Sequence, residues 1–120
     1  MKITKFEEIV AWQKAQDLAV KIYAEFSLIK DYGFKDQICR AAVSISNNIA
    51  EGFQRSSRPD FRRFLIISLG SCSEVKSMLY LAERIRYINA KKRDLLIAEV
   101  TEVSMIITGL IKYLSISKNK

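Results

Sequence analysis

The sequence predicts an all-α fold, an antiparallel bundle of four helices that run up, down, up and down. The 120 residues include only one proline and four glycines, which is too few for a turn-rich β fold. Apolar residues recur every three or four positions along most of the chain, as they do on one face of an α-helix. The breaks between these runs are short, and short connections place consecutive helices antiparallel.

We expect a single domain over residues 1–120, with helices at about 7–29, 34–54, 59–88 and 91–116. A chain of this length buries a core without the help of disulfides or metals. Hydrophobic residues make up 49% and charged residues 28%, proportions that are typical of a folded globular protein rather than a disordered one.

The first helix has two possible beginnings. Thr4 and Glu7 have the spacing of a capping box. Alternatively, the helix begins near Val10 and the apolar residues before it pack as a lead-in. At the other end, Gly33 suits the left-handed conformation that follows many helices.

The second predicted helix presents a core face and a polar seam beside it. The core stripe consists of Phe34, Ile38, Ala41, Ala42, Ile45, Ile49 and Phe53. The seam consists of Ser44, Asn48, Glu51 and Arg55. Glu51 and Arg55 form an i,i+4 pair in the favourable order, and a half-buried pair of this kind would specify which helix packs there. We expect a structural seam rather than a ligand site, with Glu74 as a candidate partner for an arginine across an interface.

The third predicted helix is apolar or small on two sides. Ser57 suits its N-cap, and Pro59 and Asp60 suit its first turn. One side faces the core, and the other side consists of Ile66, Gly70, Ser73, Ser77, Leu81 and Ile88. A helix that is apolar on both sides is normally buried on both. We therefore expect this second side to contact another copy of the chain; the alternative is a wider internal core.

The sequence gives little support for catalysis, so we expect no enzyme, no cofactor and no metal site. There is no histidine, which excludes His-based triads and most zinc sites. No glycine-rich phosphate loop is present. Cys39 and Cys72 fall inside helical patterns, and we interpret them as buried free thiols in a reducing compartment. Residues 1–8 contain acids where a signal peptide needs an apolar run, and no apolar run approaches a membrane span, so we expect a cytoplasmic protein.

The net charge of +7, from 20 Lys and Arg against 13 Asp and Glu, allows attraction to a polyanion. Two groups of basic residues stand out. The first is Arg55, Arg58, Arg62 and Arg63, placed with Lys2, Lys5, Lys118 and Lys120 by an antiparallel topology. The second is Arg84, Arg86, Lys91, Lys92 and Arg93, near Lys30 and Lys35. Such residues bind phosphate without reading bases, although they are also common at solvated helix ends.

Several motifs together resemble one known family. They are Ala-Trp-Gln-Lys-Ala at 11–15, Arg-Ala-Ala-Val-Ser-Ile at 40–45, Asn-Ile-Ala-Glu-Gly at 48–52, Arg55, Arg-Phe-Leu at 63–65, Gly-Ser at 70–71 and Glu74. In this order they resemble the four-helix-bundle proteins encoded in intervening sequences of bacterial large-subunit ribosomal RNA genes. The resemblance implies a bundle that assembles into a homopentamer, without an established biochemical activity.

This sequence departs from the family pattern at two positions. Ser46 stands where the family usually has proline, and we expect a less kinked second helix because serine keeps its backbone donor. Ser68 stands where alanine is usual.

The leading functional hypothesis is a non-enzymatic oligomer that binds nucleic acid, RNA in particular, through its basic ends. The alternative is a protein-interaction or scaffold module that makes no contact with nucleic acid. Neither hypothesis involves a membrane.

Overall fold

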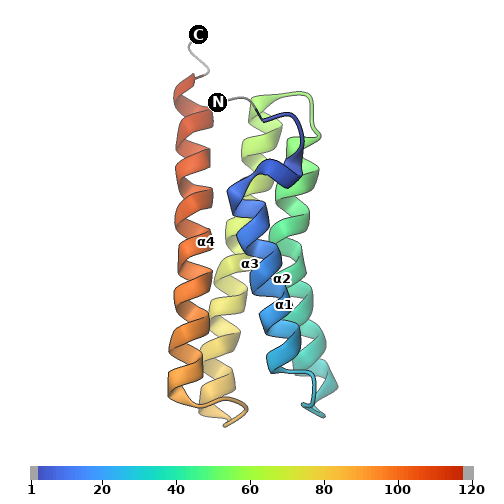
Figure 1. Cartoon of the computed structure of the whole chain (residues 1–120), viewed down its shortest axis with the longest axis vertical. Helices are drawn as coiled ribbons and strands as arrows, with labels where there is room; N and C mark the ends of the chain where they lie inside the picture. Colours follow the sequence, from blue (N-terminus) through green and yellow to red (C-terminus); the bar gives the residue numbers. More distant parts are fainter. Residues whose placement is uncertain (1–2, 118–120) are drawn as a thin grey trace.

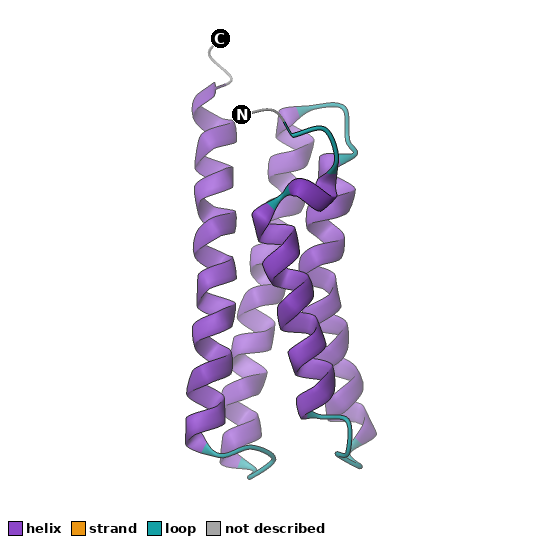
Figure 2. Ribbon diagram, viewed as in Figure 1, coloured by secondary structure: helices purple, strands orange, loops and turns teal. Residues whose placement is uncertain are grey.

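The computed structural model describes residues 3–117, which form a bundle of four long helices (Figure 1). The elements are η1 (Phe6–Glu8), a 3-10 turn, followed by α1 (Val10–Glu25), α2 (Tyr32–Phe53), α3 (Arg58–Arg84) and α4 (Ala90–Ser117). Figure 2 shows that no strand occurs in this part of the chain. The molecule measures 51 × 20 × 19 Å. The predicted all-α, up-down-up-down bundle is confirmed.

The antiparallel course gives the bundle two chemically different ends (Figure 1). We call the end that holds the α2–α3 connection, residues 54–57, the terminal end, because the described chain begins and finishes there. We call the opposite end, with the connections at residues 26–31 and 85–89, the loop end.

The first helix begins at Val10, as the second of our two alternatives predicts. The carboxylate of Glu8, not that of Glu7, accepts the backbone N–H of Thr4 at 3.0 Å. This bond closes the short turn η1, after which Ile9 enters the core in an extended conformation. The capping interaction therefore stabilises the lead-in and not the helix itself.

The α1–α2 connection differs from our prediction. α1 ends at Glu25, and α2 begins at Tyr32, so Gly33 lies in the first turn of α2 and not in a left-handed position. The reason is that Asp31 caps α2, since its carboxylate accepts the backbone N–H of Phe34 at 3.1 Å.

The predicted end of the third helix is also wrong, because α3 stops at Arg84. Arg86 has a φ of 68°, and the N–H of Tyr87 donates to the carbonyl of Ala82 at 2.8 Å. Together with the bond from Arg86 N–H to the carbonyl of Glu83, at 3.0 Å, this is a Schellman motif with arginine in the position that glycine usually occupies.

Two consequences follow at the loop end. The chain reverses at residues 85–89, and the side chain of Asn89 then caps α4 by accepting the backbone N–H of Lys92 at 2.8 Å. Ile88 folds back into the core of its own chain, with only 7% of its surface exposed. It therefore does not belong to the outward side of α3, where the sequence pattern placed it.

The core is continuous along the bundle and follows the predicted stripes. Its fully buried side chains include Leu18 and Ile22 of α1, Ile45 and Ile49 of α2, Leu65 and Leu79 of α3, and Val100 and Ile107 of α4. Two buried serines are satisfied by hydrogen bonds between helices or along them. Ser68 donates to the carbonyl of Ile45 at 2.8 Å. Ser46 accepts from the side chain of Gln16 at 3.0 Å, and α2 runs through it without interruption.

The helices α2 and α3 approach each other closely at Gly52, near the terminal end. A β-carbon at this position would lie 2.6 Å from Cβ of Phe64 and 3.0 Å from Cδ1 of Phe61. Only glycine fits here without a shift of α3, which explains why a helix-weakening residue stands inside α2.

Among the described residues, α3 is the one helix that is long and apolar enough to cross a membrane by length and composition alone. Our expectation that no segment approaches this limit was therefore too strong. In the bundle, α3 buries one side through residues such as Leu65, Cys72 and Leu79, so its apolar character reflects a core helix with a second apolar side.

We predict that Gly52→Ala lowers the free energy of unfolding by about 2 kcal/mol. Overpacking of a fixed core costs about 1–3 kcal/mol, which exceeds the gain of up to ~1 kcal/mol in helix propensity. The matched control is Gly109→Ala, because a β-carbon at Gly109 meets nothing within 4 Å. Urea denaturation at one fixed protein concentration should show a loss for the first variant and a small gain for the second. Equal gains would contradict the close approach.

The hydrogen bond between Tyr87 and Asp31 predicts a dependence of stability on pH. The Tyr87 hydroxyl donates to the Asp31 carboxylate at 2.7 Å. This bond, together with the one from the N–H of Phe34, lowers the pKa of the Asp31 carboxyl. The bond between Tyr87 and Asp31 also raises the pKa of Tyr87. The resulting stabilisation is complete above the ordinary aspartate pKa of about 3.9 and is lost as the pH falls through the lowered value. The tyrosine contribution is lost as the pH rises through the raised pKa of Tyr87.

Tyr87→Phe should therefore move the pKa of Asp31 back toward its ordinary value, as a carboxyl NMR titration would show. The control is Tyr113→Phe, at the opposite end of the bundle, which should leave the titration of Asp31 unchanged. An unchanged pKa in Tyr87→Phe would rule out this hydrogen bond in solution.

Candidate nucleic-acid interface

The first basic group lies at the terminal end, where α2 finishes and α3 begins. The guanidinium groups of Arg55 and Arg63 both lie 4.8 Å from the centroid of the Phe64 ring. Phe64 is itself buried, and its Cβ lies close to Gly52 of α2. Each arginine also has an acidic neighbour, because Arg55 pairs with Glu51 at 2.9 Å and Arg63 with Asp60 at 3.6 Å. The two cations are therefore held in place by a ring and a carboxylate.

The other two arginines of this group flank that pair. Arg58 is exposed, and its guanidinium lies 5.6 Å from the centroid of the Tyr113 ring on α4. Arg62 is half-buried and forms no ion pair within residues 3–117. Lys5 is exposed and directly precedes η1, at the same end. The predicted neighbours Lys2, Lys118 and Lys120 lie outside the described residues.

The second basic group, at the loop end, divides into exposed and paired residues. Arg84, Arg86 and Lys91 are exposed and form no ion pair in the described part of the chain. Lys92 instead pairs with Glu25 of α1 at 3.4 Å.

Arg93 also forms ion pairs with carboxylates of its own chain. It pairs with Asp94 at 3.0 Å and with Glu83 of α3 at 3.3 Å, and the hydrogen bond to Asp94 raises the pKa of its guanidinium. Lys35, a predicted neighbour, donates to the carbonyl of Ser27 at 3.1 Å, whereas Lys30 is exposed. Lys92 and Arg93 thus connect helices, while the remaining residues of the group face solvent.

The polar seam of α2 forms a hydrogen-bonded contact with α3. Asn48 donates to the hydroxyl and the carbonyl of Ser44 at 2.9 and 2.8 Å, and Ser71 of α3 donates to the same hydroxyl at 2.8 Å. Ser71 was absent from our predicted seam, although its position on α3 opposite a serine is the signal that could have identified it. Glu51 extends the seam through its ion pair with Arg55.

Glu74 lies on the exposed surface near α2, and between residues 3 and 117 it forms no ion pair with an arginine. Its carboxylate accepts from the side chain of Gln37 at 3.4 Å. The predicted arginine partner across an interface between copies stays a prediction.

The outward side of α3 is open in the single chain. Ile66 is 55% exposed and Leu81 is 47% exposed, and Ser73 and Ser77 between them face solvent. A β-carbon at Gly70 would meet no atom within 4 Å, so nothing inside the chain requires glycine there. We call the five residues Ile66, Gly70, Ser73, Ser77 and Leu81 the α3 strip. Ile88 is excluded because it is buried.

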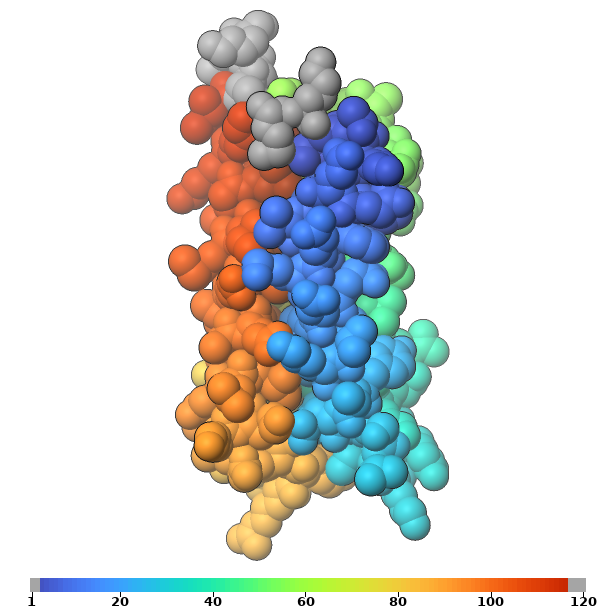
Figure 3. Space-filling model, viewed as in Figure 1, coloured from blue at the N-terminus to red at the C-terminus, as the bar shows by residue number. Residues whose placement is uncertain are grey.

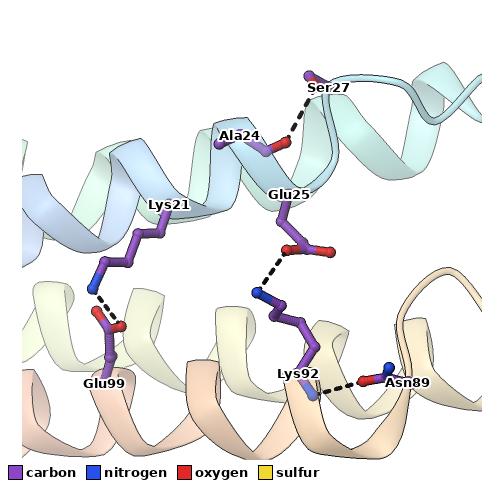
Figure 4. A network of polar contacts seen from close by, with 7 residues as sticks. All are labelled: Lys21, Ala24, Glu25, Ser27, Asn89, Lys92 and Glu99. Atoms are coloured by element: carbon purple, nitrogen blue, oxygen red, sulfur yellow. Dashed lines mark hydrogen bonds and ion pairs between the residues drawn. The ribbon is translucent and has the colours of Figure 1, made fainter.

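A series of ion pairs joins α1 to α4, and sequence reasoning missed it. Lys21 pairs with Glu99 at 2.6 Å and Lys92 with Glu25 (Figure 4), and Lys14 pairs with Glu102 at 3.3 Å. The hydrogen bond with Glu99 raises the pKa of Lys21. Figure 3 shows α1 and α4 side by side on one face of the molecule. Exposed pairs of this kind align helices and contribute little stability, so we assign them no functional role.

The described residues show no obvious catalytic or metal-binding centre. Cys39 and Cys72 are both buried and free, as predicted, and burial raises the pKa of each thiol. Between residues 3 and 117, no group of three or more Cys, Asp or Glu side chains is placed to hold a metal ion. That the protein is not an enzyme stays a prediction.

The comparisons with known proteins agree with this architecture. The model of the 23S rRNA-intervening sequence protein family matches residues 7–109. A crystal structure from Bacteroides thetaiotaomicron, of a protein with unknown function from the S23 ribosomal protein family, is 31% identical with a TM-score of 0.80. The match covers 86% of this chain and 99% of that one. No curated protein matches the chain. The chain therefore belongs to the family of 23S rRNA-intervening sequence proteins.

Proposed function

We propose that the protein is a non-catalytic, oligomeric helical bundle that binds structured RNA through its basic ends. The main support is the arrangement of Arg55 and Arg63, whose guanidinium groups are both held against the ring of Phe64 at the terminal end. Arginines that are already ordered lose less conformational entropy when they bind phosphate. Their acidic partners are exposed, so exchanging a carboxylate for a phosphate costs little.

The net charge supports the same proposal. The chain carries +7, and within residues 3–117 Arg62, Arg84, Arg86 and Lys91 form no ion pair and lie toward the ends of a rod that is 51 Å long. Binding of this kind neutralises phosphates, releases counterions and is therefore weakened by salt, with little preference for base sequence.

Assembly would multiply these contacts. The residues of the α3 strip are apolar or small, and no contact inside the chain requires glycine at position 70. Both observations support the close approach of a second helix. In a ring-shaped assembly of identical copies, every copy would contribute its own pair of basic groups. Repeated weak contacts gain strength because the second contact is made within the same complex.

The alternative is a scaffold that binds a protein through the α3 strip and does not contact nucleic acid. The observation that favours it is the neutralisation of several predicted cations. Arg55, Arg63, Lys92 and Arg93 each lie beside a carboxylate. These pairs are consistent with a basic surface that serves only solubility and helix alignment.

We predict that Arg62→Glu/Arg63→Glu abolishes binding to an RNA stem-loop in a fluorescence anisotropy titration, with the helical content and the oligomeric mass unchanged. For the wild-type protein the logarithm of the affinity should fall linearly with the logarithm of the salt concentration. Arg40→Glu/Lys14→Glu is the matched control, because it makes the same change in net charge away from both ends. Absence of RNA binding by the wild-type protein would support the scaffold instead, and an affinity that ignores ionic strength, or equal losses in both variants, would contradict binding through the terminal end.

The proposed assembly makes a separate prediction at Gly70. In sedimentation velocity the wild-type chain should have a mass that is a multiple of 13.8 kDa, five copies by the family resemblance. Gly70→Leu should shift this mass toward the monomer, because the larger side chain keeps the neighbouring helix away. Gly109→Leu is the control, since Gly109 is equally unobstructed but lies on α4. A Gly70→Leu variant that keeps the full mass would remove the α3 strip from the interface.

A further inference from the structure

Tyr32 presents an aromatic ring to solvent at the loop end, where α2 begins (Figure 1). The residue is 67% exposed, although it is the first residue of a long and well-packed helix. The ammonium of Lys35 lies over its ring, 5.4 Å from the centroid. A cation over one face leaves the opposite face of the ring for a second planar group.

The backbone on both sides of Tyr32 is anchored. Asp31 accepts the backbone N–H of Phe34 at 3.1 Å and the hydroxyl of Tyr87 at 2.7 Å, so the start of α2 is tied to the connection at 85–89. Phe34 is buried, and its ring packs edge to face on that of Tyr87 with the centroids 5.2 Å apart. An exposed ring on an anchored backbone loses less conformational entropy when it binds a ligand.

Lys35 is held in position as well. Its ammonium donates to the carbonyl of Ser27 at 3.1 Å, in the connection between α1 and α2, while it faces the ring of Tyr32. This contact limits the orientations that the ring adopts. The chain therefore orders Tyr32 from its backbone and from one face, without covering the residue.

The surroundings of Tyr32 are basic. Lys30 is exposed in the same connection. Arg84, Arg86 and Lys91 are exposed at the same end and form no ion pair in the described part of the chain. An open aromatic ring among cations is the combination with which proteins bind unpaired nucleotides, because a base stacks on the ring and the phosphates contact the cations. A continuous duplex offers the phosphates but keeps its base faces inside the stack.

We propose that the loop end binds an unpaired base of RNA, which stacks on the open face of the Tyr32 ring while neighbouring phosphates contact the surrounding cations. This inference rests on the proposed RNA binding and names the class of RNA, a stem-loop or another RNA with unpaired nucleotides. The ring of Phe64 at the terminal end is buried and does not offer the same contact. The two ends thus have different tasks, phosphate binding at one and base stacking at the other.

Two RNAs with equal numbers of phosphates, a stem-loop with a wide loop and a continuous duplex, test the proposal by fluorescence anisotropy. The wild-type protein should bind the stem-loop about tenfold more tightly, as expected for one stacked base. Tyr32→Ala should weaken the stem-loop about tenfold and leave the duplex unchanged, whereas Tyr32→Phe should bind as the wild type does. Tyr23→Ala is the matched control, because Tyr23 is 53% exposed but lies along α1, and its affinities should be unchanged.

The dependence on salt separates stacking from phosphate contact. A stacked base releases no counterion, so Tyr32→Ala should keep the wild-type slope of the logarithm of affinity against the logarithm of salt concentration. Arg84→Gln removes a cation at the same end and should reduce that slope by about one. A changed slope in Tyr32→Ala, or an unchanged slope in Arg84→Gln, would contradict the roles assigned to these residues.

The outcomes distinguish this inference from the proposed function. Equal affinities of the wild-type protein for the two RNAs, or a Tyr32→Ala variant that binds the stem-loop normally, would overturn the base contact and leave phosphate binding intact. Failure of the wild-type protein to bind either RNA would overturn both.

Discussion

The close packing of α3 against α2 is the contact on which the rest of the structure depends. At Gly52 the two helices approach so closely that a β-carbon would lie 2.6 Å from Cβ of Phe64. Farther along, Ser68 reaches the carbonyl of Ile45 and Ser71 reaches Ser44, so the register of the two helices is set by hydrogen bonds as well as by shape. This register places Phe64 between the arginines of the terminal end. It also turns the α3 strip outward, which makes the apolar second side of α3 available to another copy.

Hydrophobic periodicity was sufficient to predict the number, order and direction of the helices, because burial of one apolar face dominates their stability. It was insufficient at the helix ends. Our reading of Gly33 as a helix terminator failed because Asp31 offers a stronger signal, an N-cap bond to Phe34. After α3 ends, Arg86 adopts the left-handed conformation. The residues around it are not of the types, such as glycine or proline, that indicate a turn. Local backbone geometry there follows from Tyr87 and Ile88 packing into the core, which is a tertiary effect.

The candidate site shows the same division between local and tertiary information. The sequence identifies every basic residue at the two ends, yet it contains no sign that Lys92 finds Glu25 on another helix or that Arg93 finds Glu83. Contacts between residues four apart in the chain, such as Glu51 near the end of α2 with Arg55 just after it, could be predicted from spacing alone. The lead-in before α1 also lay beyond sequence reasoning, because the bond between Thr4 and Glu8 that closes it involves the second of two adjacent acids and forms outside the helix.

The central claim is that a second copy of the chain covers the α3 strip. The most direct measurement is the rate at which a thiol reagent modifies cysteines placed at Ser77, inside the strip, and at Ser56, in the α2–α3 connection. Both serines are exposed in the single chain, and the native Cys39 and Cys72 are buried and contribute little background. The account predicts that Ser77→Cys reacts much more slowly than Ser56→Cys at concentrations where the protein is assembled, and that dilution removes the difference. Equal rates for Ser77→Cys and Ser56→Cys at every concentration would contradict it.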